Sequence, residues 1–418
     1  MKEIKTSGGD CCATPGLMSV EQAIDNILSP AVAVEETESV DILDALNRIL
    51  AEDLSSTIDV PGYDNSAMDG YAVRSEDCQQ SGVKLPVSQR IPAGQVGEAL
   101  QSGTAARIFT GAPVPEGADA VVMQEMCEAA TVADGEQVTI NTVVKAGSNV
   151  RRAGEDIKEG SVVLKAGKRL RAQELGLLAS VGLADFKVKR KLKVATFFTG
   201  DEIVLPGQPL KAGQIYNSNR YTLRGLMQSM NCEIIDLGIV PDTLDDTVKV
   251  LKEAAACADL VVTSGGVSVG EEDYVRIALE ELGELSMWRI AMKPGKPVAF
   301  GKIDDTLFMG LPGNPVSVFV TFLLFARALI LKLQGVDDCI AKRVSVTADF
   351  DWPKVKRQEY LRVRLVQKDK QAVAQIYPHQ GSGVLSSASW AEGLVEVSVD
   401  REIKKGDTVD YLSFEGLL

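Results

Sequence analysis

The sequence predicts a multidomain protein of the α/β plus β class. The chain has 418 residues, too many for one typical hydrophobic core. Between residues 191 and 337, apolar segments with strand character alternate with segments of helical periodicity. Residues 58–150 contain short β-branched runs between Gly and Pro turns, and residues 338–418 show period-2 alternation. These patterns predict one α/β domain and two β-rich domains.

The first segment, residues 17–57, is predicted to be helical from apolar residues at helical spacing around 20–27 and again around 42–49. Helical spacing returns at 170–182, so the β-rich residues between these segments are predicted to be an insertion. Its strands are expected at 107–110, 120–124 and 138–144. The predicted domains are a discontinuous helical and extended linking domain (17–57 and 151–190), a β-rich inserted domain (58–150), an α/β domain (191–337) and a small C-terminal β-barrel or sandwich (338–418).

The α/β segment is predicted to form a parallel, doubly wound sheet. Strands are expected at 193–198, 233–240 and 259–264, helices at 218–231, 244–257 and 273–282, and three more apolar runs before a long helix after Pro315. The apolar run 316–333 contains Arg327 and is shorter than the ~20 residues of a membrane span, so we expect a buried helix. Ligands of such sheets bind beyond the carboxyl ends of the strands.

Composition restricts the function. The net charge of −14 disfavours a nucleic-acid or anionic-membrane partner, and an anionic ligand therefore needs locally gathered Lys, Arg and N–H groups. The seven cysteines contain no CxxC pair, and no secretory segment is visible, so we expect a cytoplasmic protein. With the single histidine His379, a multi-His metal site is excluded.

Polar and glycine residues follow the predicted strands of the α/β domain. Strand 193–198 runs into TGDE (199–202), strand 259–264 into SGGVSVG (264–270), and later apolar runs into KPGKP (293–297) and PGNP (312–315). Successive glycines let backbone N–H groups converge on an anion, and carboxylates beside a phosphate hold Mg²⁺. The alternatives are a structural turn for SGG, a helix cap for TGDE and solvated lysines for KPGKP. In the inserted domain, DNSAMDGYA (64–72) suits a tight loop or a second polar site.

These motifs occur in a specific order. DNSAMDGYA, TGAPVPEGADAVV, RRAGED, FTGDE, SGGVSVGEEDY, KPGKP and GLPGNPVS together resemble the molybdopterin molybdenumtransferase family, of which the E domain of gephyrin-like proteins is the eukaryotic counterpart. The resemblance runs from about Leu17 to the C-terminus. It departs from the family at Arg289, where a Lys is frequent; Arg keeps the charge but replaces a point donor with a planar fork.

The resemblance implies an elongated homodimer whose α/β domain is similar to molybdopterin adenylyltransferase and whose active site is shared between subunits. The implied reaction inserts molybdate into adenylylated molybdopterin with Mg²⁺-dependent release of AMP. The implied catalytic residues are Asp69, Thr110, Asp156, Glu202, Asp242, Asp273 and Lys293. Those expected to bind the substrate are Ser264, Gly265, Gly266, Arg289, Lys296, Pro312 and Pro315. Glu202, Asp273 and Asp242 are expected to hold Mg²⁺.

Two alternatives stay open from the sequence. The α/β domain alone is compatible with the adenylyltransferase step itself, although three accessory domains count against it. A gephyrin-like scaffold is the alternative of another class, and it would not need the TGDE and KPGKP residues. Possible partners are a molybdopterin adenylyltransferase or an apo-molybdoenzyme that receives the cofactor; no nucleic acid and no membrane are expected.

Overall fold

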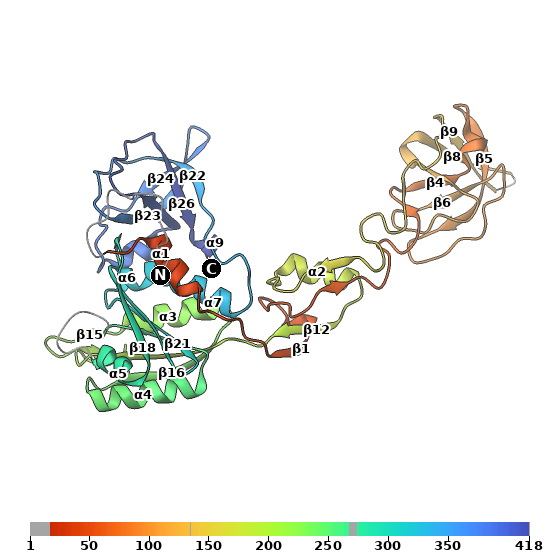
Figure 1. Ribbon diagram of the computed structural model, residues 1–418. Helices are drawn as coiled ribbons and strands as arrows, with labels where there is room; N and C mark the ends of the chain where they lie inside the picture. Colours follow the sequence, from red (N-terminus) through yellow and green to blue (C-terminus); the bar gives the residue numbers. More distant parts are fainter. Residues whose placement is uncertain (1–16, 134, 267–273, 418) are drawn as a thin grey trace, which may run out of the picture. The chain divides into compact units, whose positions relative to one another are not determined.

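The computed structural model describes residues 17–133, 135–266 and 274–417 (Figure 1). The chain divides into two compact units. Unit 1 is bounded by Met1–Glu38, Asn47–Ile49 and Val188–Leu418, and unit 2 by Ser39–Leu46 and Leu50–Lys187. Strands β1 (Thr37–Asp41) and β12 (Asp185–Lys189) carry the chain across these boundaries. Each unit is described by itself.

The α/β part of unit 1 is built on one mixed sheet with the strand order β16-β13-β17-β21-β20-β18. Strands β16, β13, β17 and β21 run parallel, whereas β20 is antiparallel to both of its neighbours. The prediction of a wholly parallel sheet is therefore wrong at this edge. The bounds are β13 (Lys193–Thr199), β16 (Glu233–Val240), β17 (Leu260–Ser264), β18 (Glu284–Arg289), β20 (Pro297–Ile303) and β21 (Thr306–Leu311).

Helices cover both faces of this sheet because alternate residues of each strand point to opposite sides. Val194, Val262 and Met309 pack with α1, α3 and the 315–333 segment, while Ala195 and Phe308 pack with α4 and α5. The helices are α1 (Val20–Leu28), α3 (Ser218–Ser229), α4 (Leu244–Cys257), α5 (Tyr274–Leu282), α6 (Pro315–Thr321), the π-helical turn η4 (Phe322–Ala326) and α7 (Arg327–Leu333). Most predicted elements of this region are confirmed.

The segment Pro315–Leu333 is the one helix of the described chain that is long and apolar enough to cross a membrane. In its most apolar window, 83% of the residues are buried inside the protein. It packs between the sheet and the C-terminal barrel, where Val316 and Phe322 share one core with Tyr360 and Leu412 (Figure 1). The expected buried helix is confirmed.

The C-terminal part of unit 1 is a closed barrel. Its strands pair in the order β23-β24-β22-β26-β25, and pairing of β25 with β23 closes the ring. The barrel is therefore confirmed over a sandwich. Its elements are β22 (Val344–Ala348), β23 (Gln358–Lys368), β24 (Gln371–Ile376), α8 (Leu385–Trp390), β25 (Gly393–Val397), β26 (Thr408–Ser413) and α9 (Phe414–Leu417). The short strand β19 (Met292–Lys293) joins its edge.

Unit 2 is dominated by one sheet with the order β7-β4-β6-β5-β9-β8. Its strands are β4 (Gly70–Val73), β5 (Val83–Ile91), β6 (Ala105–Ile108), β7 (Ala120–Met123), β8 (Cys127–Val132) and β9 (Gly135–Ile140). The remaining elements are η1 (Ile42–Asp44), β2 (Leu54–Ser55), β3 (Asn65–Ser66), η2 (Ser75–Cys78), η3 (Gln124–Met126), β10 (Val150–Arg151), β11 (Val162–Leu164) and α2 (Ala172–Ser180). The β-rich character predicted for residues 58–150 is confirmed.

The prediction of a helix in the second half of segment 17–57 is wrong. Only one 3₁₀ turn, Ile42–Asp44, forms where a helix was expected at 42–49. Asp41 caps this turn by accepting from the Leu43 N–H at 2.8 Å, and Asn47 has a φ of 64°, which a helix does not allow. The apolar spacing misled because Leu43 is 88% exposed and faces no core of the unit.

Candidate functional site

The loops at the carboxyl ends of β13, β17 and β21 surround a small polar cavity of about 150 Å³. Thr199 ends β13, Ser264 ends β17, and Gly313 follows β21. The cavity is also lined by Glu202, Asn217, Ser218, Asn219, Gly265 and Pro315, the first residue of α6. The predicted edge of the sheet therefore brings together Glu202, Ser264, Gly265 and Pro315.

Three polar atoms of this cavity are buried without a hydrogen-bond partner among the described residues. They are the Ser264 hydroxyl, the Nδ2 of Asn217 and the Oδ1 of Asn219. Each such atom costs about 1–3 kcal/mol when desolvated and unpaired, so the protein tolerates them at a place where a ligand or water can pair them. The sequence analysis missed both asparagines. Their signal was the cap position of Asn217, whose Oδ1 accepts from the Arg220 N–H at the start of α3.

Glu202 is placed by its loop. The short parallel pair β14 (Ile203–Val204) and β15 (Ile215–Tyr216) holds its backbone, with the Ile215 N–H donating to the Glu202 carbonyl at 2.8 Å. A β-carbon on Gly200 would lie 2.5 Å from the Glu202 Oε2, and Gly200 has a φ of 138°. Gly200 is therefore needed to let the exposed carboxylate fold back over its own loop.

The glycine loop after β17 is only partly described, because residues 267–273 lie outside the described chain. Gly265 and Gly266 both have positive φ values, 87° and 63°. The Gly265 N–H donates to the Leu311 carbonyl at 3.1 Å, so this amide is not available to an anion. The predicted convergence of glycine N–H groups thus does not include Gly265, whose contribution is to line the cavity.

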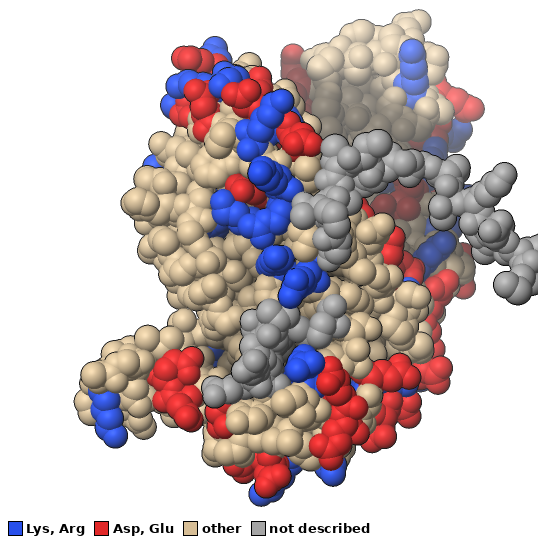
Figure 2. Space-filling view, turned by 60° about the vertical axis from the view of Figure 1, so that its left-hand side comes forward, with Lys and Arg blue, Asp and Glu red and all other residues tan. Residues whose placement is uncertain are grey.

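A second, larger cavity of about 630 Å³ adjoins the first and has a cationic lining. Lys293, Lys296 and Arg357 line it, together with Pro312, Gln380 and Ser382. Glu202, Ile215 and Gly313 line both cavities, so the two lie side by side. Figure 2 shows Lys and Arg side chains gathered on one face of a chain whose net charge is −14. The larger cavity therefore provides the local positive charge that an anionic ligand needs.

Lys293 is held by the barrel domain. Its Nζ donates to the Glu359 Oε1 at 3.0 Å, and the Trp352 indole donates to the Oε2 of the same carboxylate at 3.0 Å. Glu359 is 9% exposed, whereas the Lys293 side chain is 45% exposed. The ammonium is thus fixed at its inner side and open to the cavity. Glu359 could not be recognised from the sequence, because the pair joins residues that are 66 positions apart.

The other predicted site residues of unit 1 lie elsewhere or outside the described chain. Asp242 follows β16 at the edge of the sheet, and Arg289 ends β18 as an exposed residue; neither lines the two cavities. Asp273 lies outside the described residues. Within the described ranges, no group of three His, Cys, Asp or Glu side chains is placed to hold a metal ion.

In unit 2, Asp69 and Thr110 are brought together. The Asp69 Oδ1 accepts from the Thr110 N–H and from its hydroxyl, each at 2.8 Å, and these two bonds lower the pKa of Asp69. Both residues are exposed. Asp156 lies on a separate exposed segment, where its N–H donates to the Val60 carbonyl at 3.0 Å. Asp69 and Thr110 therefore form a rigid polar pair ready to meet a ligand or another surface.

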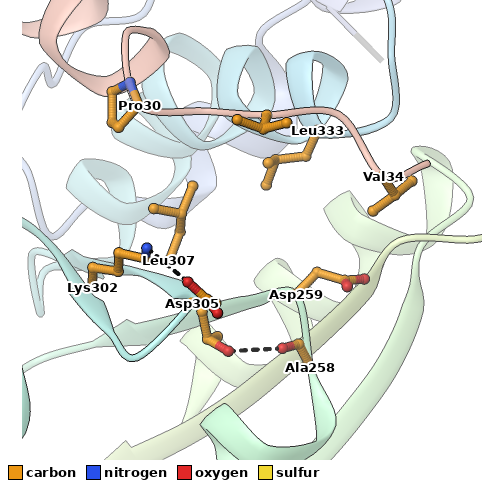
Figure 3. A pocket seen from close by; sticks show the side chains of 10 residues that line it. Pro30, Val34, Ala258, Asp259, Lys302, Asp305, Leu307 and Leu333 are labelled. Carbon is orange, nitrogen blue, oxygen red and sulfur yellow. Dashed lines mark hydrogen bonds and ion pairs between the residues drawn. The ribbon is translucent and has the colours of Figure 1, made fainter. Parts of the chain in front are cut away.

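A third cavity, of about 460 Å³, lies at the opposite ends of β17 and β21 (Figure 3). Its polar groups already have partners. The Asp259 carboxylate accepts two bonds from Arg190 at 2.7 and 2.8 Å, Lys302 pairs with Asp305 at 3.0 Å, and the Thr306 hydroxyl donates to two carbonyls. Burial raises the pKa of Asp259, but the Arg190 bonds outweigh it and the net pKa is lowered. The polar groups named here are bonded to other residues of the protein, so the carboxyl ends of the strands remain the candidate site.

Fold and site together describe a class of multidomain proteins with a cationic cavity at the carboxyl ends of an α/β sheet, next to a β-barrel. Three family descriptions match the chain in order: "MoeA N-terminal region (domain I and II)" over residues 18–182, "Probable molybdopterin binding domain" over 195–332 and "MoeA C-terminal region (domain IV)" over 345–414. The chain belongs to the molybdopterin molybdenumtransferase family.

The relatives cover most of the chain. A molybdopterin molybdenumtransferase of Haemophilus influenzae is 42% identical over 96% of this chain and 100% of its own length. One from Nostoc is 42% identical over 77% of this chain and 75% of its own length. The crystal structure of the molybdopterin biosynthesis moeA protein of Pyrococcus horikoshii has a TM-score of 0.80 and 30% identity, and the match covers 95% of this chain and 100% of that one.

Proposed function

We propose that this protein is the transferase of molybdenum cofactor biosynthesis that inserts molybdate into adenylylated molybdopterin and releases AMP in a Mg²⁺-dependent reaction. The observation that carries the proposal is the presence of two adjoining cavities at the carboxyl ends of the sheet. One is cationic, the other contains buried polar atoms without a hydrogen-bond partner among the described residues, and Glu202 lines both. A substrate with phosphate groups and polar ring systems needs both kinds of lining.

The cationic cavity suits the pyrophosphate of the substrate. Lys293, Lys296 and Arg357 offer charged donors to phosphate oxygens, and Arg357 can do so with two parallel N–H bonds. Stabilisation of the negative charge that develops on the departing AMP would supply most of the rate enhancement. No nucleophilic side chain is required, in agreement with a chain whose only histidine, His379, is exposed.

The described residues fit a magnesium ion at the small cavity. Mg²⁺ prefers oxygen ligands and keeps several of its waters. The Glu202 carboxylate lines this cavity, together with two buried oxygen atoms, on Asn219 and Ser264, that have no hydrogen-bond partner in the described part of the chain. We propose Glu202 as the carboxylate of this cavity that holds the ion, with Asn219 and Ser264 binding it through water. Asp242, which follows β16 outside the lining of this cavity, and Asp273, which lies outside the described residues, are the other two proposed carboxylate ligands. When bound, Mg²⁺ neutralises charge on the phosphate oxygens.

The proposal also gives unit 2 a part in the site at which molybdate is inserted. Asp69 and Thr110 form a fixed polar pair in unit 2, and Asp156 lies in the same unit. We propose that these three residues complete the site of the partner subunit in a homodimer. The other substrate-binding residues in this proposal are Gly265, Gly266, Arg289, Pro312 and Pro315.

The finer organisation is part of the same proposal. We propose the four-domain division at residues 17–57 with 151–190, 58–150, 191–337 and 338–418, a cytoplasmic location, and an apo-molybdoenzyme as the acceptor of the product. An adenylyltransferase would attach AMP to molybdopterin from Mg-ATP without a requirement for molybdate. A scaffold protein would release no AMP, and its loss from a cell would not be relieved by high molybdate.

The test compares Glu202→Gln with the matched control Asp201→Asn, which removes a neighbouring exposed carboxylate from the same loop. AMP release in the presence of molybdate and Mg²⁺ should fall by about 10²-fold or more in Glu202→Gln, as for loss of a group that stabilises the transition state. It should stay within about twofold in Asp201→Asn. Normal turnover of Glu202→Gln would remove Glu202 from the proposed site.

A further inference from the structure

Two arginines flank an aromatic ring on the sheet of unit 2, beside the Asp69–Thr110 pair. Arg90 on β5 and Arg107 on β6 are register partners in a parallel strand pair, so their side chains emerge next to each other. The guanidinium carbons lie 4.7 Å and 4.8 Å from the centroid of the Phe109 ring. Arg90, Arg107 and Phe109 are here called the arginine–phenylalanine cluster.

Side-by-side arginines repel each other, and the ring holds both in place. Arg107 is fixed further, since it donates to the Gly70 carbonyl at 3.1 Å and to the Gln124 Oε1 at 2.7 Å. The exposed side chain of Arg90 makes no hydrogen bond or ion pair with any residue in the described ranges; its guanidinium contacts the Phe109 ring. Its N–H donors are therefore free to bind a ligand.

The surroundings leave the cluster positively charged. Asp69 lies close enough to Arg107 for the guanidinium to help lower its pKa, after the two bonds from Thr110. The charge of Asp69 thus acts on Arg107, and Arg90 has no carboxylate partner among the described residues. The Glu125 carboxylate accepts a hydrogen bond from the Gln124 amide, and no ion pair joins it to either arginine among the described residues. A residual positive charge with unused donors, in a chain of net charge −14, is the arrangement that an anion would stabilise.

We propose that the arginine–phenylalanine cluster binds a tetrahedral oxyanion that carries two negative charges. Under the proposed function, on which the identity of the ligand rests, this oxyanion is molybdate, and a free phosphate group of the same charge is the source that the test distinguishes from it. The planar guanidinium of Arg90 gives two N–H bonds to neighbouring oxygens, and Arg107 contributes its charge and remaining donors. The adjoining Asp69–Thr110 pair lies beside the bound anion.

The test is a calorimetric titration of the full chain with sodium molybdate at constant low salt. Lys293→Ala/Lys296→Ala is used as the background, because it removes the cationic lysines of the other cavity. Arg90→Gln should weaken molybdate binding about tenfold, the effect of losing one charge-assisted contact. Lys84→Gln, the matched control, removes one exposed charge from the same strand and should change binding by less than about twofold.

A second variant, Phe109→Leu, keeps both charges and removes the ring that aligns them. It should weaken binding by about threefold to fivefold. Inorganic phosphate in competition distinguishes the sources of the oxyanion: displacement at equal concentration assigns the site to a phosphate group, and poor displacement assigns it to molybdate. Absence of saturable heat, or equal binding by Arg90→Gln and its background, would overturn the inference. Binding that depends on Arg90 in a protein without AMP release would refute the proposed function alone.

Discussion

Glu359→Gln is predicted to lower turnover through Lys293 alone. The carboxylate accepts from the Lys293 ammonium with one oxygen and from the Trp352 indole with the other, each at 3.0 Å. An amide accepts with its oxygen only, and its NH₂ then faces the remaining donor. The substitution preserves shape and removes one of the two contacts, so Glu359 is tested as a positioning residue of the cationic cavity.

The size of the effect follows from exposure. The Lys293 side chain is 45% exposed, so its ion pair contributes at most about 1 kcal/mol after solvent screening. Because Glu359 is buried, the donor that loses its acceptor in the Gln variant costs about 1 kcal/mol more. If 1–2 kcal/mol of this positioning is lost in the transition state, kcat/KM falls by about fivefold to thirtyfold.

The assay is a double-mutant cycle on kcat/KM for AMP release, with wild type, Glu359→Gln, Lys293→Ala and the double variant. The loss from Glu359→Gln should shrink to less than about twofold in the Lys293→Ala background. An equal loss in both backgrounds would refute the reasoning, because Glu359 would then act independently of the lysine. Trp352→Phe is the matched control, which leaves the ion pair intact and should cost less than about threefold.

Three further predictions concern stability and the second unit. Asp259→Asn should lower the free energy of unfolding by about 2–3 kcal/mol at pH 7. The native pKa of Asp259 is lowered, so its stabilisation is present above the ordinary pKa of about 4, and the difference in urea unfolding should narrow as the pH falls below that value. Gly70→Ala should unfold unit 2, since a β-carbon there would lie 1.8 Å from a β7 carbonyl oxygen, while Gly62→Ala, with its nearest atom at 3.7 Å, should change proteolytic resistance little. Thr110→Val removes the hydroxyl that donates to Asp69, and should lower kcat/KM about fivefold with little change in melting temperature.

Each of these has a contradicting result. A constant difference for Asp259→Asn between pH 7 and pH 3 would mean that its charge does not contribute. Protease resistance of Gly70→Ala equal to that of Gly62→Ala would show that the strands can separate to admit a methyl group. Full activity of Thr110→Val would leave the backbone N–H as the sole functional contact of Asp69.

The α/β elements were predictable because burial imposes periodicity on them. The helix expected at 244–257 and the strand at 233–240 were found at those bounds, since one face or both faces of each pack on a core. The antiparallel direction of β20 was not predicted, because an apolar run of this kind looks the same in a parallel and an antiparallel strand. Its direction is set by the tight turn to β21, where Asp304 has a φ of 51°.

The candidate site could be located from the sequence but not completed from it. Glycine, proline and charged residues after each strand indicated the edge of the sheet at which the two adjoining cavities lie. The partners of those residues come from distant segments: Glu359 lies on the barrel, and Asn217 and Asn219 lie at the start of a helix. One side-chain atom of each asparagine lacks a hydrogen-bond partner among the described residues, and this is a property of packing that no spacing along the chain records.

The most direct test of the central claim measures AMP released from adenylylated molybdopterin by the purified full chain with Mg²⁺, with and without molybdate. The account predicts release that depends on molybdate and yields a cofactor able to activate an apo-molybdoenzyme. Absence of AMP release under every metal condition would contradict the account, and would favour a protein that binds its ligand without catalysing a transfer.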